Sequence, residues 1–99
     1  MLLPISRQDE SLFPEFSSHG EAANYFKERF GSDFIFKCVE PIGDMNCYFY
    51  VVVVDHEAYR RGNKLLSQGI PVSGELGTKY LMSHQIVEIM ENGSVHVVH

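Results

Sequence analysis

Tryptophan is absent from the 99 residues, only two cysteines occur, and no long hydrophobic run is present. Cys38 and Cys47 are too few for a disulfide-stapled secreted scaffold, so we expect reduced, partly buried thiols. The longest apolar run, residues 47–54, is far shorter than the ~20 residues that a membrane helix needs. The first residues also lack the cationic and apolar segments of a signal peptide. These absences predict a cytoplasmic protein that is not embedded in a membrane.

Positive charge is also scarce. The chain has 8 basic and 13 acidic residues, which gives a formal net charge of -5. Nucleic-acid binders usually gather a basic excess on one face, so this balance disfavours binding to DNA or RNA. The one compact basic group is Arg60, Arg61 and Lys64. We expect it to be a solvated helix face, and contact with nucleic acid through it is a minor alternative hypothesis.

What the chain does have is the composition of one small folded domain. Hydrophobic residues make up 44% and charged residues 21%, and 99 residues can bury one core. Residues 1–16 mix apolar residues with prolines and show no regular period. We therefore expect residues 1–16 to be a loosely packed N-terminal arm, with a short strand near residues 2–5, and residues 17–99 to be a single α+β domain.

Two helices are well marked. Ser18 and Glu21 have the spacing of a capping box, and apolar residues at helical spacing then predict a helix over residues 19–30. Asp55 is the expected N-cap of a second helix over residues 56–67. Gly62 lies inside this second helix, where glycine is unfavourable, so we expect close packing on the sheet at that position.

Four segments read as strands. Residues 33–40 and 47–54 predict one antiparallel hairpin, and residues 80–91 and 94–99 predict another. The second hairpin encloses Asn92-Gly93, the preferred pair for a two-residue type I′ turn, which would place Glu91 opposite Ser94, Ile89 opposite His96 and Val87 opposite Val98. The glycine-rich residues 68–78 are expected to be a flexible connection.

The element order is therefore α-β-β-α-β-β. The fold class that this order predicts is α+β, with a four-stranded antiparallel sheet and two helices packed on one face. Such a sheet leaves a face or an edge open for a partner.

Five histidines invite a search for a metal site: His19, His56, His84, His96 and His99. Their spacing forms no zinc motif, although the expected hairpin would bring His84, Glu88 and His99 to one face. His56 lies between Asp55 and Glu57, where it could act as a general base, but the two carboxylates also suit a helix N-terminus. We predict no catalytic residue, no metal and no cofactor, and keep a small metal-dependent or acid/base enzyme as an alternative.

The residues 47–54 are apolar on both sides, so one side must face the helices. We expect Phe49, Val51 and Val53 to be core, which would leave Tyr48 and Tyr50 on an open face of the kind that protein interfaces favour. Core packing on both faces, with the N-terminal arm as cover, is an equal alternative. Tyr48 and Tyr50, together with Glu75 and Leu76 of the 68–78 segment, are the candidate protein-binding residues.

The leading hypothesis is a small acidic non-catalytic protein-binding module, a regulator, adaptor or inhibitor, that acts through an exposed sheet face or edge. Three sequence features support it: the lack of motifs, the acidic balance and the doubly apolar strand. The expected partner is another protein, and a homodimer is a further expectation.

Overall fold

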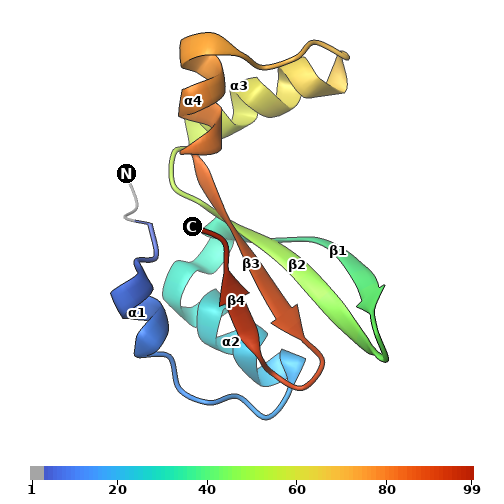
Figure 1. Cartoon of the computed structure of the whole chain (residues 1–99). Helices are drawn as coiled ribbons and strands as arrows, with labels where there is room; N and C mark the ends of the chain where they lie inside the picture. The colour runs from blue at the N-terminus through green and yellow to red at the C-terminus, as the bar shows by residue number, and fades with distance from the viewer. Residues whose placement is uncertain (1–3) are drawn as a thin grey trace.

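The computed structural model describes residues 4–99, which fold around one four-stranded sheet (Figure 1). Its elements are, in chain order, α1 (Arg7–Ser11), α2 (His19–Phe30), a 3₁₀ turn η1 (Gly31–Asp33), β1 (Phe34–Ile42), β2 (Met45–Val53), α3 (His56–Ser67), α4 (Gly74–Leu81), β3 (His84–Met90) and β4 (Val95–Val97). The strands are antiparallel and lie in the order β1-β2-β3-β4. The predicted α+β class and the antiparallel sheet are confirmed, and α1 and α4 are additional helices.

The boundaries of α2 and α3 agree with the sequence because their caps form. The Ser18 hydroxyl accepts the Glu21 amide at 3.2 Å, and the Asp55 carboxylate accepts the Ala58 amide at 3.2 Å. Each bond satisfies an amide that the first helical turn leaves free. Glu21 itself accepts a hydrogen bond from the Ser17 hydroxyl at 2.7 Å, so α2 is held by its preceding residues as well.

The main core lies between α2 and one face of the sheet. Its centre is Phe26, which is fully buried and packs on Phe34 of β1 at a ring-centroid distance of 5.5 Å. The other buried members come from the arm, α2 and the strands β2, β3 and β4: Ile5, Ala22, Ala23, Phe30, Tyr50, Val52, Val87, Ile89 and Val97.

The prediction that the tyrosine-bearing side of β2 is open is wrong, and residues 50–53 are buried on both sides of the strand, as the equal alternative predicts. Tyr50 lies in this core, stacked on Phe34 at 4.3 Å, and its hydroxyl pairs with His19 Nε2 at 2.7 Å. Tyr48 stacks on the His19 imidazole at 3.6 Å. Burial raises the pKa of Tyr50 and lowers that of His19, so both are neutral at neutral pH. The helix-facing side of β2 accepts tyrosines because His19 supplies the polar partner that a buried hydroxyl requires.

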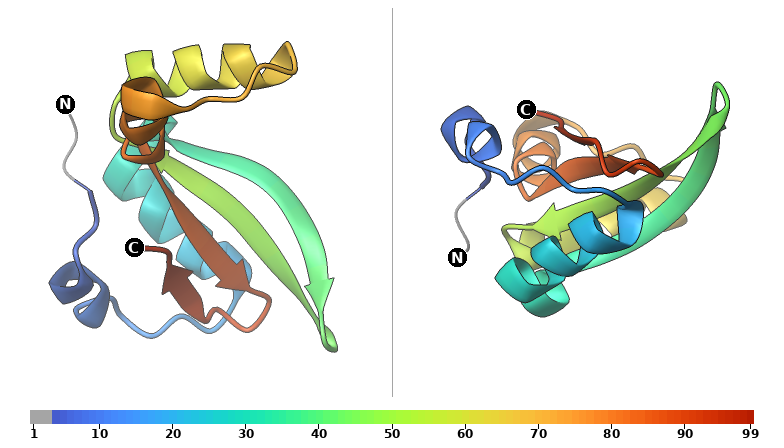
Figure 2. Two further views of the ribbon diagram at one scale, coloured as in Figure 1. Left: turned by 45° about the horizontal axis from the view of Figure 1, so that its top comes forward. Right: turned by 90° about the horizontal axis from the view of Figure 1, so that it is seen from below.

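The helices α3 and α4 pack on each other beyond the end of the sheet where β2 stops and β3 starts (Figures 1 and 2). Two hydrogen bonds fix them there, because the amides of Val54 and Asp55 both donate to the Ser83 carbonyl at 2.7 and 3.0 Å. The second predicted helix therefore does not lie beside α2. It covers only one end of the opposite face.

The prediction of a flexible connection over residues 68–78 is wrong for its second half, because Gly74–Leu81 is helical. Two glycines in eight residues hide this helix from propensity arguments. Its stability comes from packing instead. Tyr80 of α4 lies directly against Gly62 of α3, where a Cβ atom would come within 2.0 Å of the ring. The close approach expected at Gly62 is real, but it is made with α4.

The C-terminal hairpin is shifted by one residue from the predicted register. Ile89 lies opposite Val95, Val87 opposite Val97 and Glu88 opposite His96. The turn has three residues, with Gly93 at φ 91° donating to the Met90 carbonyl at 3.0 Å. A shift of one residue moves every side chain of a strand to the other face. Val97 thereby enters the core, and His96 points to the opposite face.

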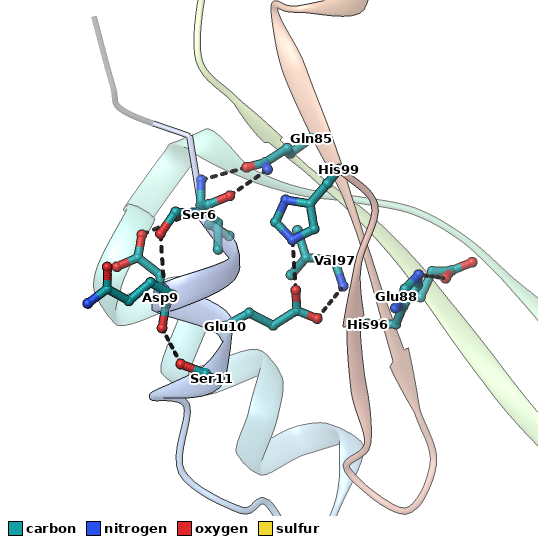
Figure 3. A network of polar contacts seen from close by, with 11 residues as sticks. Ser6, Asp9, Glu10, Ser11, Gln85, Glu88, His96, Val97 and His99 are labelled. Atoms are coloured by element: carbon teal, nitrogen blue, oxygen red, sulfur yellow. Dashed lines mark hydrogen bonds and ion pairs between the residues drawn. The ribbon is translucent and has the colours of Figure 1, made fainter.

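The segment before α2 is fixed to the C-terminal hairpin at three points (Figure 3). Gln85 makes two hydrogen bonds to the backbone of Ile5, at 2.7 and 2.8 Å. The Glu10 carboxylate of α1 accepts from the Val97 amide at 3.5 Å and pairs with His99 Nε2 at 2.7 Å. Residues Leu2 and Leu3, where a short strand was expected, lie outside the described residues.

The contacts of Glu10 predict a pH-dependent contribution to stability. The main cause that lowers the pKa of Glu10 is the hydrogen bond from His99, and partial burial opposes it. The hydrogen bond from the Val97 amide lowers the pKa further, as do the charges of His99 and His96 to a smaller extent. A lowered carboxyl pKa stabilises the fold above the unfolded value of about 4.5, and this contribution is lost as the pH falls through the folded pKa. We expect Glu10→Gln to lower the free energy of unfolding by about 1 kcal/mol at pH 7.

This difference between wild type and Glu10→Gln should be smaller at about pH 3 than at pH 7, because it is lost as the pH falls through the lowered pKa of Glu10 and the carboxylate is protonated. Urea unfolding at both pH values measures it. Glu28→Gln on the exposed side of α2 is the control and should show no pH-dependent difference. Equal losses for Glu10→Gln at pH 7 and pH 3 would contradict the assignment.

Candidate functional site

The side of the sheet opposite α2 carries a recess under the α3–α4 pair, which we call the aromatic recess. Its volume is about 330 Å³, and five elements contribute to its walls. The side chains that determine its chemistry are Lys37 of β1, Phe49 of β2, Tyr59 and Asn63 of α3, Tyr80 of α4 and His84 of β3.

The aromatic walls are held in place by the packing of α3 on α4. Gly62 leaves room for the Tyr80 ring, which stacks on Tyr59 at 6.1 Å with an interplanar angle of 8°. The Tyr80 hydroxyl donates to Asn63 Oδ1 at 2.7 Å. Burial raises the pKa of Tyr80, so this hydroxyl stays protonated and keeps donating at neutral pH.

His84 forms the floor next to these rings, 5.0 Å from Tyr59 and 4.9 Å from Tyr80 between ring centroids. The Ser83 hydroxyl donates to the Tyr80 carbonyl at 2.5 Å, so its oxygen accepts from His84 Nδ1 at 3.1 Å. This pattern assigns the imidazole proton to Nδ1. Burial lowers the pKa of His84, with a partly opposing hydrogen bond to Tyr80, and the ring is neutral at neutral pH.

Lys37 supplies the positive charge at the rim. Its Nζ donates to the Tyr59 hydroxyl at 3.3 Å and lies 5.9 Å from the centroid of that ring. The pairing of β1 with β2 is irregular between Phe36 and Cys38, which places Lys37 in a bulge. Bulges often redirect a side chain next to functional sites.

A second hollow shares His84 and Ile86 with the recess and extends to the N-terminal arm, where Pro4, Gln85 and His99 line it. We call it the apolar depression. It encloses about 410 Å³ near the start of β3, and its chief apolar side chains are Leu81, Met82, Ile86 and Val98. These four are 74%, 75%, 38% and 41% exposed. Large apolar side chains that gather around one hollow in this way often mark an interaction site.

The four candidate protein-binding residues do not come together. Tyr50 is buried in the core under α2, and Tyr48 is half-buried against His19. Glu75 and Leu76 lie in the first turn of α4, where the Glu75 carboxylate pairs with Lys79 at 3.4 Å. A role of these residues in binding a partner stays a prediction.

The histidines are also distributed over separate contacts. His56 pairs with Asp33 at 2.5 Å, His99 with Glu10, and His96 lies 4.0 Å from Glu88. The expected grouping of His84, Glu88 and His99 on one face is wrong, because the register shift moves His99 toward α1. Within residues 4–99, no three His, Cys, Asp or Glu side chains are arranged to hold a metal ion.

The cysteines and the basic group have simple environments. Cys38 is an exposed free thiol and Cys47 a buried one. Burial raises the pKa of Cys47, which keeps it a neutral thiol. Arg60, Arg61 and Lys64 lie on the exposed surface of α3.

The aromatic recess was not predicted from the sequence. Tyr59 and Asn63 are four residues apart on a helix and so lie on one face, which is the only local signal. Tyr80 and His84 join them through the packing of α4, a helix that the sequence did not indicate.

Comparison of the chain with protein-family models, with curated proteins and with solved structures gave no match. In the part of the chain that the structure describes, no helix is long and apolar enough to cross a membrane.

Proposed function

We propose that this protein is a small non-catalytic binding module whose apolar depression receives another protein. The observation that carries the proposal is the gathering of Leu81, Met82, Ile86 and Val98, each more than a third exposed, around one hollow. Full burial of an exposed side chain of this size contributes roughly 1.5–3 kcal/mol, so Leu81 and Met82 would gain most from a partner and the partly buried Ile86 and Val98 less. The face proposed for binding is the one that carries Phe49 and Ile86, whereas the sequence favoured the face that carries Tyr48 and Tyr50.

The sheet edges are less suited to a partner than this face. Edge strand β1 carries the Lys37 bulge and Pro41, which has no amide hydrogen to donate. Edge strand β4 has three residues, and Glu10 already accepts the Val97 amide. Bulges, proline, charge and short length are the features by which proteins prevent edge pairing. This favours binding through the face.

A charge placed in the depression tests the proposal. Leu81→Asp should weaken capture of a protein partner by tenfold or more, about 1.4 kcal/mol, because the carboxylate would have to be desolvated in an apolar contact. Leu12→Asp is the matched control: Leu12 has the same 74% exposure but lies at the end of α1. The measurement is affinity capture from cell extract with both variants, followed by reconstitution with the purified partner.

Retained binding by Leu81→Asp would contradict the proposal. Native mass spectrometry of the purified protein tests the alternative that a second copy of this chain occupies the depression. A homodimer that Leu81→Asp dissociates and Leu12→Asp preserves would assign the depression to a second copy of this chain and replace the proposal of a different partner.

A further inference from the structure

We infer that the aromatic recess is a binding site for a small planar aromatic carboxylate that also carries an O–H or N–H donor. This inference goes beyond the proposed protein contact, since it concerns a small molecule and a different hollow.

The size and walls of the recess favour a flat ligand. Its volume of about 330 Å³ is at the lower end of small-molecule sites, which span roughly 300–1,000 Å³. The rings of Tyr59 and Tyr80 are nearly parallel, and Phe49 contributes a third aromatic wall. Aromatic walls of this kind pack best on another ring, in stacked or edge-on contact. A recess of this volume has room for a ligand of one ring.

The polar groups at the Lys37 end favour an anion. The ammonium of Lys37 uses one of its three hydrogens on the Tyr59 hydroxyl, at 3.3 Å, and keeps two for a ligand. The Tyr59 hydroxyl accepts this bond and donates to no residue from 4 to 99, so its hydrogen is also available to a ligand. An ammonium beside a phenol offers donors of the kind that a carboxylate accepts. The one lining carboxylate, Glu40, lies three residues further along β1, about 10 Å away.

The polar group on the floor favours a donor on the ligand. Because His84 carries its proton on Nδ1, its Nε2 is a hydrogen-bond acceptor, and this atom makes no hydrogen bond to any residue from 4 to 99. Burial is what keeps the ring neutral and the lone pair available. Both the His84 ring and Lys37 Nζ lie within 6 Å of the Tyr59 ring centroid. Since both residues also line the recess, we take one ligand ring packed against Tyr59 to contact both.

The probe for this site is 4-hydroxybenzoate, which has the ring, the carboxylate and the donor. Titration of the full chain, followed by amide chemical shifts, should show saturable binding with a Kd on the order of 1 mM or tighter, as expected for ten non-hydrogen atoms. The shifts should be largest at the recess residues. Benzoate, which lacks the donor, and 4-hydroxybenzamide, which lacks the charge, should each bind several-fold more weakly.

Lys37→Met should weaken binding of 4-hydroxybenzoate about tenfold, because it removes the charge and keeps the length of the side chain. Lys79→Met, which removes an exposed charge from α4, is the control and should stay within about twofold of wild type. No saturation at millimolar concentration, shifts elsewhere on the molecule, or equal affinity for Lys37→Met would each overturn the inference. Leu81→Asp should bind the probe like wild type. The two proposals can therefore fail independently, one by loss of probe binding to the recess and the other by retained partner binding to the depression.

Discussion

Gly93→Ala is expected to lower the free energy of unfolding by roughly 3–4 kcal/mol. Gly93 has φ 91°, a conformation that side chains rarely adopt, and an added Cβ would come within 2.3 Å of the Phe16 carbonyl oxygen and 2.9 Å of the Ser18 amide nitrogen. Both clashes are with backbone, which cannot turn away as a side chain could. Chemical denaturation at pH 7 measures the loss.

Gly43→Ala separates the two causes of this loss. Gly43 also has a positive φ, 65°, but an added Cβ would meet no atom within 4 Å. It should cost only the conformational term, about 1–2 kcal/mol. The excess at Gly93 then measures how tightly the segment before α2 packs on the C-terminal turn. Equal losses at the two positions would show that the segment moves aside freely.

The second large effect is expected at Gly62. Glycine inside a helix normally costs up to about 1 kcal/mol relative to alanine, so Gly→Ala should stabilise. At Gly62 we expect the opposite, a loss of roughly 2 kcal/mol, because three carbons of the Tyr80 ring lie 2.0–2.6 Å from the new Cβ. Displacing Tyr80 also removes a wall of the aromatic recess, so binding of 4-hydroxybenzoate should weaken.

Gly20→Ala in α2 is the matched control, because the nearest atom to its new Cβ is the Ser18 hydroxyl oxygen at 3.9 Å. It should be neutral or slightly stabilising in the same unfolding experiment. Equal effects of Gly62→Ala and Gly20→Ala would contradict a direct contact between Gly62 and the Tyr80 ring.

The parts of the fold that the sequence predicts well are those whose signals are local. Ser18 and Asp55 cap their helices through side chains three residues away from the amides that they bind. Such bonds depend on little beyond the segment itself, so the boundaries of α2 and α3 follow from spacing alone.

The errors arise where two readings fit the same residues. Asn92-Gly93 suits a two-residue turn, and it also suits the three-residue turn that the chain adopts with Gly93 at positive φ. The β2 strand is apolar on both sides, so alternation could not say which side α2 covers. The choice depended on the partner that His19 provides for the Tyr50 hydroxyl, 31 residues away.

The aromatic recess lay beyond prediction for a related reason. Tyr59, Tyr80 and His84 come from α3, α4 and β3, and their meeting depends on the Gly62–Tyr80 contact. No single segment carries a signal for a site that is assembled by tertiary packing.

The attachment of the N-terminal arm sets a limit on the order of folding. Ile5 and Gln85 are 80 residues apart in the chain, and Glu10 and His99 are 89 apart. The two hairpins of the sheet join neighbouring residues and can close early, whereas these distant contacts carry a large loop-closure cost. During synthesis on the ribosome, Ile5 cannot take its place in the core until β3 and β4 have emerged. The arm is therefore expected to be the last part of the chain to dock, after α2 and the first hairpin have emerged.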